Sequence, residues 1–408
     1  MNPIQGLSLK QARKLVIASQ LMSSSPAKIA RQEATLKVVE QLGYIQIDTI
    51  SVVERAHHHT LWSRLPRYSQ DDLFFLQKQR QIFEYWSHAA AYLPIRDFRY
   101  SLPRKQAIAS GERHWYASDA KLNQKVLDRV RAEGPLQAKD FESDVKRDVN
   151  KWGGGRPSKR ALEQLFMQGE LMIAERKGFQ KVYDLTERVL PAGIDVSTPT
   201  EEQHIDHLIR SYLSANGLGS APQIAYLLKG MRAKVENRCR QLCEDNALDE
   251  IQVNGLNYYV LPDFDKKIPV RPSTKTIKIL SPFDNLLIQR KRTLELFGFD
   301  YQIECYVPAK KRRYGYFCLP LLWGQDFAGR LDAKINRKTG VLSIMNLHME
   351  TTKHEQFAKE FAEVMWRFLK FNQGNSFELV RVSSPTSDND KKLRDLIWKF
   401  LVDPNTSC

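Results

Sequence analysis

Gln46 and Asp48 are the side chains of this sequence best placed to do chemistry together. They lie in the run YIQIDTI, residues 44–50, where β-forming residues alternate with polar ones, which predicts a short strand. In a strand, Gln46 and Asp48 share one face, and Ile45 and Ile47 share the other. An amide and a carboxylate held on a rigid element can grip one water molecule. Alternatively, Asp48 caps a turn and Gln46 faces solvent.

The composition favours nucleic acid as the partner of the chain. The 408 residues contain 62 Lys and Arg against 47 Asp and Glu, a net charge of +15, and 42% are hydrophobic. A balance this basic favours a polyanion, although a merely basic soluble protein is the alternative. The length suits several modules of ordinary size. We expect salt to weaken DNA binding steeply, because phosphate contacts release counterions.

The sequence predicts a cytoplasmic protein without a cofactor. No apolar run approaches the roughly 18–20 residues that a membrane span needs, and the start lacks the apolar core of a secretory signal. The five cysteines form no CxxC pair, and Cys239 and Cys243 favour helix packing over metal binding. Nucleotide-binding, zinc-protease and serine-hydrolase motifs are absent. We expect a monomer, with no membrane contact.

Three successive segments are predicted to place two strands after their helices, which is the order of a winged helix, a helix-turn-helix variant. Winged helices also serve as protein–protein modules. The elements expected for the first module are helices at 7–22 and 26–42 and strands at 44–50 and 57–63. Those expected for the second are helices at 136–141 and 159–168 and a hairpin around Lys177 and Gly178. Those expected for the third are helices at 201–215, 221–228 and 229–246 and a hairpin around Asn254 and Gly255.

The C-terminal part predicts an antiparallel sheet or barrel. The strands expected there are 275–284, 300–311, 312–323, 327–337 and 341–349, with a helix near 285–297. An amphipathic helix at 353–371, a strand and a last helix follow. The predicted fold class is α+β: tandem winged-helix modules, a helical scaffold and a C-terminal antiparallel, barrel-like β module. The predicted domains are residues 1–132, 133–198, 199–272 and 273–408.

Several basic residues and histidines are candidates for DNA contact, although each can equally be an exposed charged turn. The run from His57 to His59 is interpreted as a solvated or phosphate-facing hairpin rather than a metal site, because adjacent strand residues point to opposite faces. The stretch EYW at residues 84–86 offers aromatic rings that can stack on a base, but core packing is favoured. The DNA-binding candidates are His58, His59, Arg64, Lys311, Arg312, Arg313, Arg337 and Lys338.

The sequence resembles the AlkZ/YcaQ (AlkX) family of winged-helix bacterial DNA glycosylases, most closely the YcaQ/AlkX branch, over nearly the whole chain. Gln46 and Asp48 match the Q-Φ-D form of the family motif, with Ile47 as Φ; the AlkZ branch has a second glutamine where Asp48 stands. The segments that carry the resemblance are QIDTI (46–50), EYWSHAA (84–90), FQKVYDLTERVLP (179–191), LSPFD (280–284), RKR (290–292) and ECYVPAKKRRYGYFCLPLL (304–322).

The resemblance implies a C-shaped DNA-repair enzyme of the bacterial cytoplasm, associated with the nucleoid. It implies excision of N7-alkylated purines and unhooking of interstrand crosslinks in double-stranded DNA, with Gln46 and Asp48 as catalytic residues. No lysine occupies the motif, which favours a monofunctional glycosylase that uses water. By analogy with the family, the hairpin at 335–341, with Arg337 and Lys338 at its tip, is expected to probe the duplex.

Two other readings remain open from the sequence. The first is a transcription regulator with several winged helices, in which Gln46 and Asp48 are structural. Such a regulator usually has a dimerisation or effector module, and none is identifiable here; sequence-selective affinity for undamaged duplex would favour it. The second is a lesion-recognition protein without catalysis. We favour the enzyme.

Overall fold

A computed structural model of the chain describes residues 5–22, 29–112, 119–141, 157–269, 276–385 and 390–402. The chain forms two compact units, each with a hydrophobic core of its own. Unit 1 comprises residues Met1–Ile29, Ile45–Tyr68 and Leu208–Cys408, and unit 2 comprises Ala30–Tyr44 and Ser69–His207. Both candidate catalytic residues belong to unit 1. No helix among the described residues is long and apolar enough to cross a membrane.

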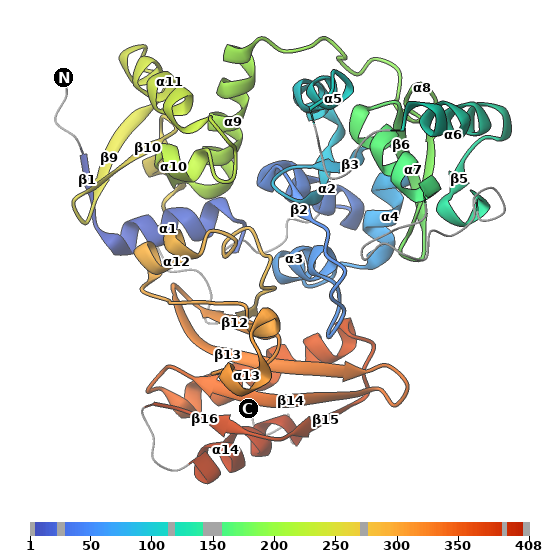
Figure 1. Cartoon of the computed structure of the whole chain (residues 1–408). Helices are drawn as coiled ribbons and strands as arrows, with labels where there is room; N and C mark the ends of the chain where they lie inside the picture. The colour runs from blue at the N-terminus through green and yellow to red at the C-terminus, as the bar shows by residue number, and fades with distance from the viewer. Residues whose placement is uncertain are drawn as a thin grey trace. The chain divides into compact units, whose positions relative to one another are not determined.

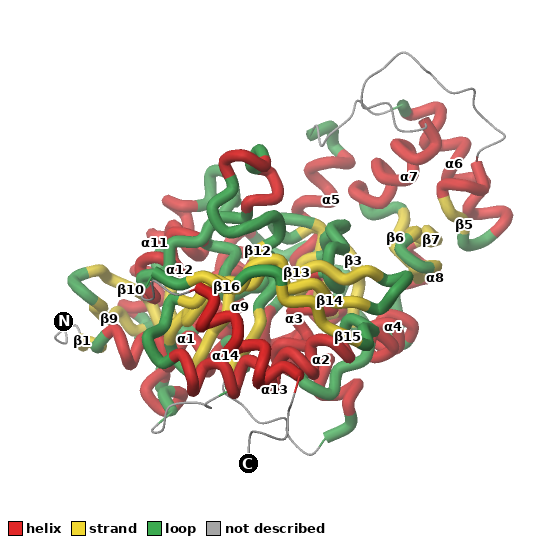
Figure 2. Tube along the Cα trace, turned by 90° about the horizontal axis from the view of Figure 1, so that it is seen from below, coloured by secondary structure: helices red, strands yellow, loops and turns green. Residues whose placement is uncertain are grey.

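A curled sheet in the order β11-β12-β13-β14-β15, with β16 also paired to β14, forms one part of unit 1 (Figure 1). Tight turns at Gly324 and Gly340, both with positive φ, join its antiparallel strands. Helices α13 and α14 lie side by side against it (Figure 2). The bounds are β11 (Ile277–Ile279), β12 (Cys318–Trp323), β13 (Asp326–Asn336), β14 (Val341–Met349), α13 (His354–Phe371), β15 (Ser376–Leu379), β16 (Val382–Ser383) and α14 (Asp390–Val402).

The strand predicted over residues 300–311 is wrong. The segment instead forms two short 3₁₀ turns, η4 (Glu304–Tyr306) and η5 (Ala309–Lys311). The carboxylate of Glu304 accepts hydrogen bonds from three successive backbone N–H groups, those of residues 313–315, at 2.9, 2.8 and 3.0 Å. The chain therefore folds back on itself, and Pro308 has no N–H to give to a strand partner.

Unit 1 also contains a four-stranded sheet in the order β1-β9-β10-β8. The predicted hairpin around Asn254 and Gly255 is confirmed, and both residues have the positive φ that a tight two-residue turn requires. Helix α1 packs beside α12 in the same core. The bounds are β1 (Gln5–Leu7), α1 (Leu9–Ser19), α9 (Glu201–Asn216), β8 (Leu218–Gly219), α10 (Ala221–Ile224), α11 (Arg232–Glu244), β9 (Asp249–Val253), β10 (Leu256–Val260), η3 (Phe264–Lys267) and α12 (Arg290–Phe297).

Unit 2 holds a module with the same order of elements: helix, strand, helical turn, helix and hairpin. Its bounds are α6 (Ala120–Glu133), β5 (Leu136–Gln137), η2 (Ala138–Phe141), α7 (Pro157–Gln168), β6 (Leu171–Lys177) and β7 (Gln180–Leu185). Its sheet order β5-β7-β6 parallels β8-β10-β9, with the last strand in the middle. The remaining elements of unit 2 are α2 (Arg31–Leu42), α4 (Gln70–Lys78), β3 (Ile82–Trp86), β4 (Ala90–Pro94), η1 (Ile95–Ser101), α5 (Leu102–Ala109) and α8 (Thr186–Val189).

The strand predicted over residues 57–63 is also wrong, because these residues form helix α3 (Ala56–Arg64). His59 and Trp62, three residues apart, lie on one face of this helix and pack against the aromatic rings of α13. Trp62 stacks on Phe371 with ring centroids 4.9 Å apart. The first predicted module therefore lacks its closing strand. The fold as a whole is α+β.

Candidate active site

Strand β2 (Ile45–Gln46) leads directly into the loop that carries Asp48. The strand is shorter than predicted, but Ile45 and Ile47 are buried as the alternation requires, and Gln46 is only 7% exposed. Asp48 follows the strand and is half-buried. Its Oδ1 accepts a hydrogen bond of 2.7 Å from the backbone N–H of Ile50, an Asx-type turn that fixes the carboxylate.

Burial raises the pKa of Asp48, and the hydrogen bond from Ile50 lowers it in part. A half-buried carboxylate is screened less by water than an exposed one, so its charge acts more strongly on a nearby cation. This is the electrostatic property that a group stabilising a positively charged reaction centre needs.

Two residues of the η4 turn, Cys305 and Tyr306, lie close enough to Asp48 to respond to its charge. Burial raises the pKa of the Cys305 thiol, and the Asp48 carboxylate raises it further. Burial also raises the pKa of the Tyr306 hydroxyl. The charges of Cys305 and, less strongly, of Asp48 raise that pKa further. Tyr306 is nevertheless 74% exposed, so its ring is accessible from solvent. Neither residue was predicted from the sequence, because the segment around them was expected to be a strand.

The hairpin between β13 and β14 holds the loop that follows Asp48. The guanidinium of Arg337 donates hydrogen bonds to the carbonyl oxygens of Ser51 at 2.8 Å and Val53 at 3.1 Å. Figure 1 shows the loop after β2 reaching this hairpin. Arg337 therefore fixes the loop, whereas its contact with DNA stays a prediction. Lys338 is exposed beside it, and its role also stays a prediction.

Two residues predicted to touch DNA, His59 and Arg64, are instead buried inside unit 1. Arg64 donates to both carboxylate oxygens of Asp284, at 2.7 and 2.9 Å, and to the backbone and side-chain oxygens of Gln20. His59 Nε2 lies 3.0 Å from the carbonyl oxygen of Ile279, and burial lowers its pKa to about 4, which leaves it neutral at pH 7. Both predictions are wrong, because neither side chain reaches the surface of the protein.

The other predicted DNA contacts differ in exposure. His58 is half-buried, its Nδ1 lies 2.6 Å from the hydroxyl of Tyr68, and burial followed by a nearby arginine lowers its pKa to about 3. Lys311 and Arg313 are exposed. Arg312 is half-buried and lies over the ring of Tyr316, 4.8 Å from its centroid. Arg312 thus helps to hold the conformation of its own turn. DNA contact by His58, Lys311, Arg312 and Arg313 stays a prediction.

Among the residues that the structure describes, no group of three or more His, Cys, Asp or Glu side chains is placed to hold a metal ion.

Comparison with known proteins gives the family of the chain. The sequence profile of a family described as "DNA glycosylase AlkZ-like" matches residues 39–371, which is well over half of the chain. The fold resembles that of the Streptomyces sahachiroi DNA glycosylase AlkZ, with a TM-score of 0.61 and 15% sequence identity, over 93% of this chain and 100% of that one. The chain therefore belongs to the AlkZ-like DNA glycosylase family and is a DNA glycosylase, an enzyme of DNA repair.

Proposed function

We propose that the protein is a monofunctional glycosylase that hydrolyses the N-glycosidic bond of N7-alkylated purines and unhooks interstrand crosslinks in double-stranded DNA. The observation that carries the proposal is the half-buried Asp48 carboxylate, which lies two residues after Gln46 and is fixed by the backbone N–H of Ile50, in a chain of this family. The electrostatics of Asp48 suit a reaction that develops positive charge on the substrate.

Alkylation at N7 places a positive charge on the purine, so the base leaves without an acid to protonate it. When the C1′–N9 bond breaks, its electron pair moves into the purine and neutralises that charge, and the sugar becomes cationic at C1′. The anionic Asp48 stabilises this cation. Gln46 and Asp48 hold a water whose oxygen bonds to C1′ and whose proton passes to the carboxylate. A positioned base of this kind contributes about 10²–10⁴-fold in rate.

The absence of a lysine from the motif at residues 46–50 supports the monofunctional reaction. A Schiff-base mechanism needs an amine at the sugar, and an amide–carboxylate pair supplies none. The expected products are a free base and an abasic site with an unbroken strand.

We further propose that the module built on residues 133–198 together with the preceding helix α6, and the module built on residues 199–272, are winged helices that grip the duplex. Their common element order and their matching sheet orders support this, and hairpin wings of this kind contact DNA in known winged helices. A crosslinked base is tethered to the opposite strand and cannot be flipped into a closed pocket. An open site approached by the hairpin at 335–341 fits such a substrate.

Tyr306 is proposed to stack on the lesion or its neighbouring base, because its ring is exposed and the charge of Asp48 raises the pKa of its hydroxyl. Tyr306→Ala should weaken binding of lesion-containing duplex by about 1–3 kcal/mol. Tyr306→Phe keeps the ring and should bind as wild type does. Equal loss in both variants would assign the effect to the hydroxyl and reject stacking.

The test of the function is excision from duplexes that carry N7-methylguanine or a nitrogen-mustard crosslink. We expect abasic product from the first and separated strands from the second. A folded enzyme that binds both lesions and releases no base would be a lesion-recognition protein. We also propose that the protein acts as a monomer in the bacterial cytoplasm, near the nucleoid, and a dimer in light scattering would contradict the first part.

A further inference from the structure

A polar pocket with a volume of about 430 Å³ opens in unit 1, between the segment after η5, strand β14 and the chain around β16. We propose that this pocket binds a backbone phosphate of the DNA that flanks the lesion, an inference that rests on the proposed glycosylase function. The residues that carry the argument are Arg313, Tyr314, Asn346, His348, Arg381 and Ser383.

The charge of the lining suits an anion. Arg313 and Arg381 are both exposed, and no carboxylate within the described residues pairs with either guanidinium. Among the described residues that line the pocket, two are arginines and one, Asp390, is acidic. The neighbouring Arg330 is paired with Glu350 and adds no free charge. Two unpaired guanidinium groups at one pocket can hold a phosphate through forked hydrogen bonds.

The wall of the pocket is braced by hydrogen bonds between side chains. The hydroxyl of Ser383 donates to Asn346 Oδ1 at 3.3 Å and lies 3.0 Å from Nδ1 of His348. The amide of Asn346 donates to the carbonyl oxygen of Tyr314 at 2.9 Å. These bonds tie β14, β16 and the loop that carries Arg313 into one frame. The arginines therefore project from a fixed wall.

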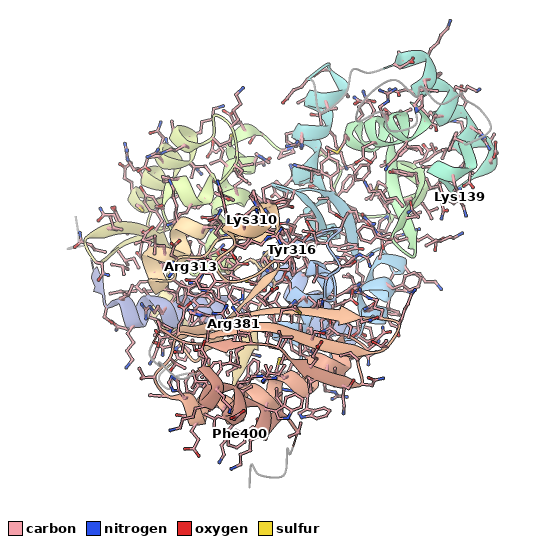
Figure 3. The ribbon with its side chains drawn as sticks, turned by 60° about the horizontal axis from the view of Figure 1, so that its bottom comes forward. Lys139, Lys310, Arg313, Tyr316, Arg381 and Phe400 are labelled. Carbon is pink, nitrogen blue, oxygen red and sulfur yellow. The ribbon has the colours of Figure 1, made fainter. Side chains whose placement is uncertain are left out.

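The pocket is linked to the catalytic carboxylate through one short segment. The Glu304 carboxylate binds the backbone N–H groups of residues 313–315, which include Arg313. Cys305 and Tyr306, the next residues after Glu304, respond to the charge of Asp48. We therefore expect the backbone of a duplex whose lesion lies at Asp48 to pass near Arg313. Figure 3 shows Lys310, Arg313, Tyr316 and Arg381 gathered on one part of unit 1.

The test measures how salt weakens binding of an undamaged duplex to the full chain. Each phosphate charge that a protein neutralises adds about 0.9 to the slope of log K against log salt. Arg313→Ala and Arg381→Ala should each lower the slope by up to about 0.9, and Arg313→Lys should keep most of it. Lys10→Ala removes the same charge from an exposed site on α1 and should leave the slope nearly unchanged. Unchanged slopes in both arginine variants would overturn the proposal.

Two further arms separate the alternatives. Calorimetry with inorganic phosphate in the absence of DNA shows whether the pocket binds a free anion. If phosphate binds but the arginine variants leave the salt slope of DNA binding unchanged, the pocket is a free-phosphate site and the DNA contact is rejected. Excision by the wild type is measured in parallel. Lack of excision with lowered slopes would reject the glycosylase chemistry and keep the pocket, whereas excision with unchanged slopes would reject the pocket alone.

Discussion

The Asp48 carboxylate combines partial burial with one fixed hydrogen bond, from Ile50. Burial removes water that would solvate the anion, and the hydrogen bond from Ile50 replaces part of that stabilisation. The result is a charge that is held in place and only weakly screened, close to the exposed ring of Tyr306. A side chain of this kind acts on a cationic sugar without forming a covalent bond to it.

The pH dependence of excision tests the charge state of Asp48. Because the pKa of Asp48 is raised above its ordinary value of 3.8, the carboxylate takes up its proton earlier as the pH falls. The leaving base carries a permanent charge, so no acid is needed. Single-turnover excision of N7-methylguanine should be flat near neutral pH and should fall on the acid side, with a midpoint above 3.8. A rate that rises with acidity would contradict this and indicate leaving-group protonation.

Helix α3 owes its position to a buried ion pair. Arg64 of this helix and Asp284 of the LSPFD segment have fully buried side chains. Removing one partner leaves a buried charge without compensation. Arg64→Ala should therefore lower the free energy of unfolding by about 3–5 kcal/mol. Asp326→Ala removes the exposed carboxylate that pairs with Arg13. Because that carboxylate gains little from the pair over its hydration in water, the free energy of unfolding should fall by about 0–1 kcal/mol, as denaturant titration would show.

A loss of less than about 1 kcal/mol in Arg64→Ala would show that the pair is not what holds α3.

The predictions that His59 and Arg64 contact DNA were wrong because both side chains are buried. Charge and ring type alone do not show whether a side chain faces water, and the acidic partner of Arg64 lies 220 residues away in the sequence.

The hairpin at 335–341 is expected to have two separable functions. Arg337 holds the loop after Asp48, so Arg337→Ala should lower the single-turnover excision rate about 10-fold or more, since a small misplacement of catalytic groups costs up to 100-fold. Lys338→Ala should instead weaken duplex affinity and leave the rate at saturating enzyme unchanged. Equal effects of both variants on affinity alone would assign both residues to DNA contact.

Local signals in the sequence predicted several elements correctly. The hairpin at Asn254 and Gly255 carries the residue types that its turn requires, and the helix predicted to end at residue 42 does end there, with Gly43 at a positive φ. The errors arose where distant contacts decide the structure. Residues 57–63 are helical because α3 packs on α13, and residues 300–311 form turns because Glu304 binds backbone groups further along the chain. The pair Gln46 and Asp48 could be proposed from the sequence, whereas Tyr306 could be considered only once tertiary folding had placed its segment in turns.

The chain shares its fold with AlkZ of Streptomyces sahachiroi at only 15% identity. Two modules have the same element order, and each unit holds the hairpin of one of them. The curled sheet of unit 1 adds a hairpin that holds the loop after Asp48. With a net charge of +15, the protein as a whole attracts the DNA backbone, and we propose that unit 1 carries the catalytic residues. Binding and catalysis are therefore expected to be separable by mutation.

The most direct test of this account is excision of N7-methylguanine by wild type and by Asp48→Asn under single-turnover conditions, with duplex affinity measured alongside. Asparagine keeps the shape of Asp48 and removes its charge. We predict that the variant binds the lesion duplex as wild type does and that its rate falls about 10²–10⁴-fold. A folded Asp48→Asn variant that still excises the base at the wild-type rate would contradict the central claim that this carboxylate drives the reaction.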